Sequence, residues 1–83
     1  MTTILRLAAT LAKTGKTRSP HYADIALGVF TKPVKLGVRA AGWPEHEVEA
    51  INAARVAGAS DSDLRKLVCK LHEARRAMQP ALS

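Results

Sequence analysis

The first part of the chain carries apolar residues at helical spacing. Between residues 3 and 13, apolar side chains recur at i, i+3, i+4 and i+7, which places them on one face of a helix. Gly15 predicts the end of this helix, because glycine readily adopts the left-handed conformation found there. Arg6 and Thr10 interrupt the apolar run, so we interpret it as a packing helix of the domain rather than a leader.

A second, shorter helix is predicted by Ser19-Pro20. Serine can accept hydrogen bonds from the free N–H groups of a first turn, and proline is tolerated at the first helical position. We expect this helix to run from Ser19 to about Leu27, with Gly28 ending it. The expected inner face carries Tyr22, Ile25 and Ala26. A short connection joins it to the first helix, which is typical of a helix-turn-helix and also of an ordinary helical hairpin.

The spacing of apolar residues then changes from that of a helix to the alternation of a β-hairpin. Pro33 breaks the helix, and the next residues, Val34-Lys35-Leu36, alternate apolar and basic as a half-buried strand does. Gly37 opens a tight turn, and residues 39–43 return as a second strand. Trp43 is expected to fill the core between this hairpin and the helices. The pattern therefore predicts a winged helix-turn-helix.

Two more helices are predicted after the hairpin. The third begins at Pro44 and ends near Gly58, and residues 60–63 offer several caps for a fourth, from about Asp61 to Met78. Its apolar stripe consists of Leu64, Leu67, Val68, Leu71 and Met78. This stripe either closes its own domain or forms an assembly element. We thus expect a mostly α fold: a DNA-binding domain over residues 1–58 and, as part of the same domain, a C-terminal helix over residues 59–83.

Charge changes the picture of the first half. The net charge is +6, and all of it lies in residues 1–43, where seven basic residues face one acid, Asp24. Residues 44–83 hold six basic and six acidic residues, which cancel. A one-sided basic surface is expected of a protein that binds a polyanion, although such patches are also often only solvated.

Other chemistry is not supported by the residue pattern. Gly15-Lys16-Thr17 resembles the end of a phosphate-binding loop, but such a loop also needs a glycine five residues earlier, where this chain has Thr10. Cys69 and His72 share a helix face, yet the other histidines lie on distant elements, so we expect a buried thiol and no metal. One cysteine allows no internal disulfide, which suits a reducing compartment. We expect a non-enzyme without cofactor.

Three blocks resemble the AlpA-type prophage regulators, an excisionase-like family: RSPHYADI, GVFTKPVKLGVRAAGWPEHEVEA and AARVAG. The similarity covers about residues 4–58. It implies a MerR-like winged helix-turn-helix from a mobile element, acting as a recombination directionality factor or as a transcriptional regulator of integrase and prophage genes. It also places the DNA-reading helix at Arg18, Ser19, His21 and Tyr22, and the wing at Lys35 and Arg39.

These observations together predict a sequence-specific binder of double-stranded DNA, most simply an excisionase that bends attachment-site DNA for an integrase. The alternatives are a transcriptional regulator and a helical protein-interaction adaptor. We expect self-association on DNA, as a dimer or a head-to-tail row, and a location in the bacterial cytoplasm at the nucleoid. Tyr22 either faces DNA or packs inside. The candidate DNA contacts are Lys16, Arg18, Ser19, His21, Tyr22, Lys32, Lys35 and Arg39.

Overall fold

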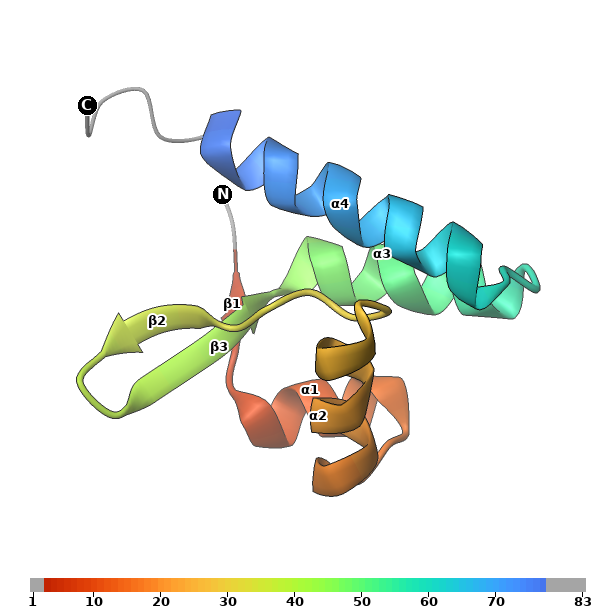
Figure 1. Ribbon diagram of the computed structural model, residues 1–83. Helices are drawn as coiled ribbons and strands as arrows, with labels where there is room; N and C mark the ends of the chain where they lie inside the picture. The colour runs from red at the N-terminus through yellow and green to blue at the C-terminus, as the bar shows by residue number, and fades with distance from the viewer. Residues whose placement is uncertain (1–2, 78–83) are drawn as a thin grey trace.

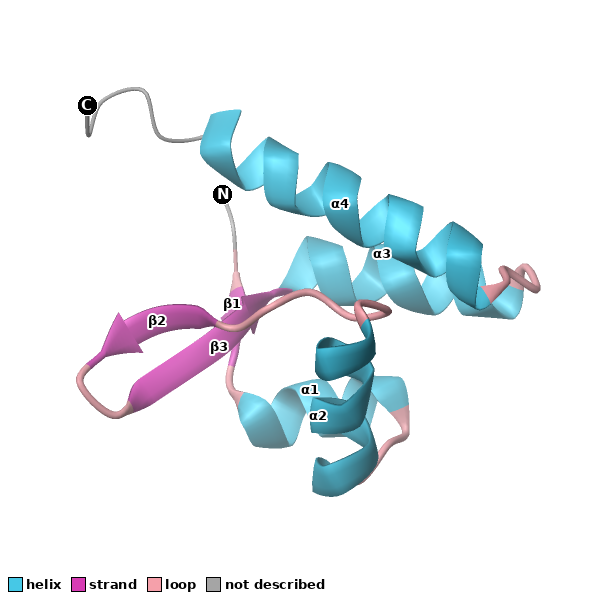
Figure 2. Cartoon of the chain, viewed as in Figure 1, coloured by secondary structure: helices cyan, strands magenta, loops and turns pink. Residues whose placement is uncertain are grey.

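The computed structural model describes residues 3–77 of the chain and confirms the expected fold class. It is a mostly helical winged helix-turn-helix with a small antiparallel sheet and C-terminal helices (Figures 1 and 2). The elements are β1 (Ile4–Leu5), α1 (Leu7–Thr14), α2 (Arg18–Leu27), β2 (Val34–Gly37), β3 (Ala40–Pro44), α3 (Glu45–Val56) and α4 (Asp61–Ala77). Within the described residues, no helix is long and apolar enough to cross a membrane.

The wing is the hairpin of β2 and β3, and it projects to one side of the helices (Figure 1). Val34 pairs with Gly42 and Lys35 pairs with Ala41, and the register shifts before Gly37 pairs with Ala40. The turn consists of Val38 and Arg39. The predicted strands and turn are therefore confirmed, with the second strand displaced by one residue toward the C-terminus.

The start of the chain differs from the prediction. Ile4 and Leu5 are not helical: they form β1, which pairs with Pro44 and Trp43 of β3. Because β3 would otherwise present an open edge, the extended conformation of these two residues satisfies backbone groups that a helix would leave unpaired. The strand order is thus β1-β3-β2, with β3 in the centre. Helix α1 begins only at Leu7.

Gly42 is required where the three strands meet. A Cβ atom at this position would lie 2.6 Å from a side-chain carbon of Ile4 and 2.7 Å from the backbone oxygen of Leu5. Both distances are shorter than any ordinary carbon contact, so the close approach of β1 to β3 depends on a residue without a side chain.

Trp43 fills the core between the sheet and the helices, as predicted. It is 1 % exposed, and its indole N–H donates a hydrogen bond of 3.0 Å to the backbone oxygen of Thr31. This bond satisfies the single polar atom of the buried ring. It also ties β3 to the segment that leaves α2. The core consists of Val29, Phe30, Trp43, Val48, Ile51, Leu64 and Val68.

The orientation of α2 corrects the predicted face. The helix begins at Arg18, one residue before Ser19, and no side chain caps its N-terminus. Ile25 packs against the core as expected, but Tyr22 and Ala26 are exposed. His21, which sequence analysis placed among the DNA contacts, is the buried residue of this helix.

Helix α4 packs on α3, on the side of the molecule away from α1 (Figure 1), and Nε of its Arg65 donates to the backbone oxygen of Leu27 at the end of α2. Leu64 and Val68 belong to the core, and Leu67 and Leu71 pack against it. Met78 lies outside the described residues. The described part of the predicted assembly stripe is therefore occupied within the monomer, which favours the alternative that this helix closes its own domain.

The boundaries of the last two helices also refine the predictions. Pro44 is the last residue of β3, and α3 begins at Glu45. Ser60 is the residue that caps α4: its hydroxyl accepts from the Asp63 N–H at 3.1 Å, and Asp63 accepts from the Ser60 N–H at 3.2 Å. This reciprocal pair is a capping box. Cys69 is exposed, so the prediction of a buried thiol was wrong.

Candidate nucleic-acid interface

The outer face of α2 carries small side chains and one aromatic ring. Ser19, Tyr22, Ala23 and Ala26 are exposed at the spacing of a single helix face. Tyr22 is 42 % exposed, so part of its side chain is available to a ligand. A helix face with short side chains can approach another surface closely. A hydroxyl and methyl groups are also suited to reading base edges in a major groove.

The wing presents basic and apolar side chains together. Lys35 and Arg39 are exposed, as predicted for phosphate and groove contacts. Between them, Val38 at the turn is 94 % exposed and Leu36 is 45 % exposed. The wing is therefore an extended, exposed hairpin whose tip holds one arginine.

A hollow of about 450 Å³ lies between α2 and the wing. We call it the arginine hollow, because three arginines from separate parts of the chain line it: one before α1, one in α2 and one in the turn of the wing. Its lining residues are Arg6, Leu7, Ala8, Arg18, Tyr22, Arg39, Ala41 and Trp43. Among residues 3–77, the salt bridges involve other basic residues, so no carboxylate neutralises Arg6, Arg18 or Arg39.

His21 does not lie on this exposed surface. Its side chain is 1 % exposed and packs edge-on against the rings of Phe30 and Trp43, with centroid distances of 4.8 and 4.7 Å. Burial lowers the pKa of this imidazole below 6.5, because the charged form would lose its hydration. A neutral buried ring stabilises the core and has no access to a base edge.

Lys16 is engaged by a carboxylate. Its ammonium pairs with Asp24, which also accepts a hydrogen bond of 3.0 Å from Arg55. Burial alone would raise the pKa of Asp24, but the hydrogen bonds from the two basic residues outweigh it and lower the pKa below 3.8. Lys16, in the turn before α2, is therefore held by Asp24 rather than standing free for phosphate as predicted, and Arg55 joins the same carboxylate to α3.

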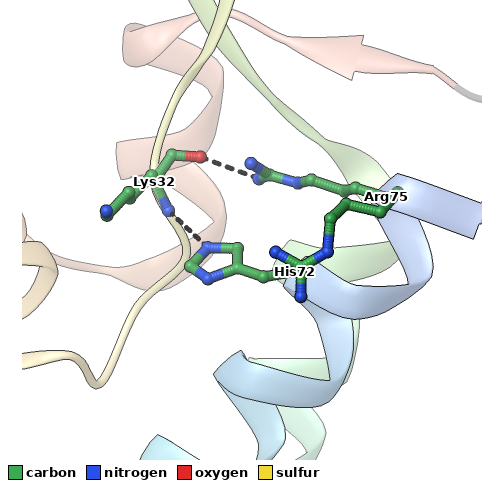
Figure 3. Close-up of a pocket in the computed structure, with 4 residues that line it drawn as sticks. Lys32, His72 and Arg75 are labelled. Carbon is green, nitrogen blue, oxygen red and sulfur yellow. Dashed lines mark hydrogen bonds between the residues drawn. The ribbon is translucent and has the colours of Figure 1, made fainter. Parts of the chain in front are cut away.

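Lys32 lies away from the arginine hollow, beside α4. Its backbone N–H donates to Nε2 of His72 at 3.1 Å, and its backbone oxygen accepts from Arg75 at 2.7 Å (Figure 3). The Lys32 side chain is exposed and points away from both partners (Figure 3). Burial, followed by the charge of Arg75, lowers the pKa of His72 below 6.5. A neutral His72 is the form that can accept this hydrogen bond.

Arg75 is held by Glu47, which is almost fully buried. Two guanidinium nitrogens of Arg75 contact the two carboxylate oxygens of Glu47, one of them at 2.7 Å. This bidentate pair fixes the C-terminal half of α4 to α3. Among residues 3–77, no group of three histidine, cysteine, aspartate or glutamate side chains could hold a metal ion.

Sequence reasoning missed Arg6 as a candidate contact. The predicted helix over residues 3–13 assigned this residue to a packing segment, whereas the structure ends β1 before it and brings it beside the wing. Its only sequence signal was its positive charge. The structure thus groups Arg18, Tyr22 and Arg39 with Arg6 around the hollow, whereas Lys16, His21 and Lys32 do not line it.

An exposed helix beside a basic wing defines a winged helix-turn-helix protein suited to a polyanion. The model of the family described as "Prophage CP4-57 regulatory protein (AlpA)" matches residues 3–55. This match covers more than half of the chain, so the protein belongs to the AlpA family of phage-related DNA-binding regulators. No match was found among curated proteins, and none among solved structures.

Proposed function

We propose that this chain binds double-stranded DNA sequence-specifically and acts as an excisionase of a mobile genetic element. The observation that carries the proposal is the common exposure of the outer face of α2 and the wing, with unneutralised arginines between them. This arrangement joins a surface that can read bases to cations that can hold phosphates. Membership of the AlpA family supports DNA as the polyanion.

The proposed docking places α2 in the major groove. Ser19 and Tyr22 then lie nearest the base edges, while Ala23 and Ala26 can contact thymine methyl groups. Lys35 holds a phosphate, and Arg39 at the tip of the wing reaches a narrow minor groove. In this docking α4 lies away from the DNA and closes the domain from behind (Figure 1).

An excisionase needs no catalytic group of its own. It binds beside an attachment site, bends the DNA, and helps an integrase to assemble there, in the cytoplasm where the DNA lies. Bending a site of 20–30 bp costs on the order of 1–6 kcal/mol, and several bound protomers can share that cost. Each short recognition helix reads few base pairs, so specificity also requires self-association on the DNA.

The second candidate is a transcriptional regulator with the same mode of DNA binding. The family description, a prophage regulatory protein, favours it. The two candidates share the DNA interface and differ in the process that DNA binding controls, recombination or transcription. A third candidate, an interaction adaptor whose basic surface is only solvated, would not bind DNA in a salt-dependent way.

The test is recombination in vitro between attachment sites, with purified integrase and increasing amounts of this protein. Excision that depends on the protein, and that is lost in an Arg39→Ala variant, supports the proposal. The matched control is Arg76→Ala on α4, which is exposed and does not line the arginine hollow. Repression or activation of a promoter without any effect on excision would favour the regulator.

A further inference from the structure

The arginine hollow lies between the two elements that are proposed to enter different grooves. Helix α2 contributes Arg18 and Tyr22, and the wing contributes Arg39 and Ala41. A major groove and the adjacent minor groove of a duplex are separated by one sugar–phosphate strand. If α2 and the wing occupy neighbouring grooves, this strand must pass between them, over the hollow.

The position of Arg6 is fixed by its backbone rather than by its side chain. Its backbone oxygen accepts hydrogen bonds of 3.0 Å from both the N–H and the hydroxyl of Thr10, which is fully buried. The pairing of Leu5 with Trp43 holds the preceding residue against the central strand. The side chain of Arg6 is exposed at the rim of the hollow, with no carboxylate partner among the described residues.

The chemistry of the hollow suits a phosphodiester. Three arginines line the hollow together with apolar side chains, and an arginine fork can donate two parallel hydrogen bonds to a phosphate. The first two residues of α1 also line the hollow, and no side chain caps this helix N-terminus. Its dipole adds to the attraction for an anion, although the arginines carry the argument.

We infer that the arginine hollow is a DNA-backbone site in which Arg6 and Arg18 clamp the phosphates of the strand between the two grooves, while Arg39 flanks the same strand from the minor groove. The inference rests on the proposed DNA-binding function and adds Arg6 to it. Arg6 positions the protein along the duplex and reads no base. It couples the supporting helix α1 to the docking of α2 and the wing.

The test combines a protein variant with a chemically altered duplex. The duplex is selected from random sequences by the wild-type protein, and single phosphates are replaced by uncharged methylphosphonates. Arg6→Gln should lower affinity about fivefold. It should also reduce the slope of log K against log salt by about 1, without changing the selected sequence. Arg76→Gln, an equal loss of charge on α4, serves as the control and should have little effect.

Pairing the variant with the altered duplex gives the decisive readout. At one or two linkages, methylphosphonate should weaken the wild-type protein, while Arg6→Gln should lose little further affinity there. The inference is overturned if Arg6→Gln binds like Arg76→Gln, or if its methylphosphonate profile equals that of the wild type. If the wild-type protein binds no duplex, the proposed function itself fails. A circular dichroism melt of Arg6→Gln should match that of the wild type, since the side chain is exposed.

Discussion

Arginines serve two different purposes in this small domain. Arg55 and Arg75 reach into the interior, where Asp24 and Glu47 neutralise them, and there they join α2 and α4 to α3. Arg6, Arg18 and Arg39 surround an open hollow without a carboxylate partner among residues 3–77. The first group stabilises the fold, and the second leaves positive charge available to a ligand. The two groups differ in whether a carboxylate pairs with the arginines.

This comparison also explains why net charge was an incomplete guide. In residues 44–83, where the charges cancel, Arg75 pairs with Glu47. However, Lys16 in the basic half is paired as well, with Asp24. Neutralisation depends on which elements pack together, which sequence spacing does not reveal across 8 or 28 residues.

The largest expected effect is the loss of folding when α4 is removed, because this helix contributes side chains to the core. A chain that ends at Gly58 loses Leu64 and Val68 from the core and loses Arg75, the partner of Glu47. The domain should then fail to fold, because these losses approach the 5–15 kcal/mol stability of a typical domain. Circular dichroism and urea titration of the truncated chain would test this.

Two leucine variants test the same claim by smaller changes in unfolding free energy. Leu64→Ala should cost about 2–5 kcal/mol of unfolding free energy, because the side chain is buried. Leu27→Ala should cost roughly 0.5 kcal/mol or less, because Leu27 is 60 % exposed. A truncated chain that unfolds cooperatively with the stability of the full chain would show that α4 does not close the core.

Removing Arg75 should have the next largest effect. Arg75→Ala leaves the buried carboxylate of Glu47 without its partner, at a cost of about 3–5 kcal/mol. The double variant Glu47→Leu/Arg75→Met removes both charges and should recover much of this loss. Chemical denaturation of the three proteins measures both terms. Equal stability of Arg75→Ala and the wild type would contradict the structural role of this arginine.

Replacing the basic residues of the wing should instead lower DNA affinity and leave stability almost unchanged. Lys35→Ala and Arg39→Ala should each weaken DNA binding by about 1 kcal/mol, roughly fivefold. The unfolding free energy should change by no more than about 0.5 kcal/mol, because both side chains are exposed. Fluorescence anisotropy with a labelled duplex and a thermal melt of each variant give the two numbers. A variant that loses stability and retains affinity would reverse the assignment.

Stability should decrease as the pH falls below about 6.5. The pKa values of His21 and His72 are lowered by burial from 6.5, so the unfolded chain takes up protons before the folded one. The full stability is therefore present above about pH 6.5 and is lost as the pH falls toward the lowered pKa values. Asp24 and Asp63, whose pKa values lie below 3.8, titrate in a separate, more acidic range.

Urea titrations at pH 7.5 and 5.5 would measure this loss. His72→Gln, which keeps an acceptor for the Lys32 N–H, should show a smaller loss than the wild type. His46→Gln serves as the control, since His46 is exposed. A wild-type protein with equal stability at both pH values would contradict the burial of neutral histidines.

Sequence analysis predicted the helices, the wing and the core role of Trp43, because helical spacing, glycine stops and the Pro33 break are local signals. It missed β1, since the extended state of Ile4 and Leu5 depends on pairing with a strand almost 40 residues later. It also misassigned His21 and overlooked Arg6 for the same reason. The inward face of α2 and the approach of Arg6 to the wing both depend on tertiary contacts, which local sequence patterns do not reveal.

The central claim is that the unpaired basic surface of α2, the wing and the arginine hollow binds the phosphates of double-stranded DNA. Titration of a selected duplex at several salt concentrations tests it most directly. With about four to six phosphate contacts, log K should fall against log salt with a slope of roughly −4 to −5. A slope near zero, or equal slopes for the wild type and an Arg6/Arg18/Arg39→Gln variant, would contradict the claim.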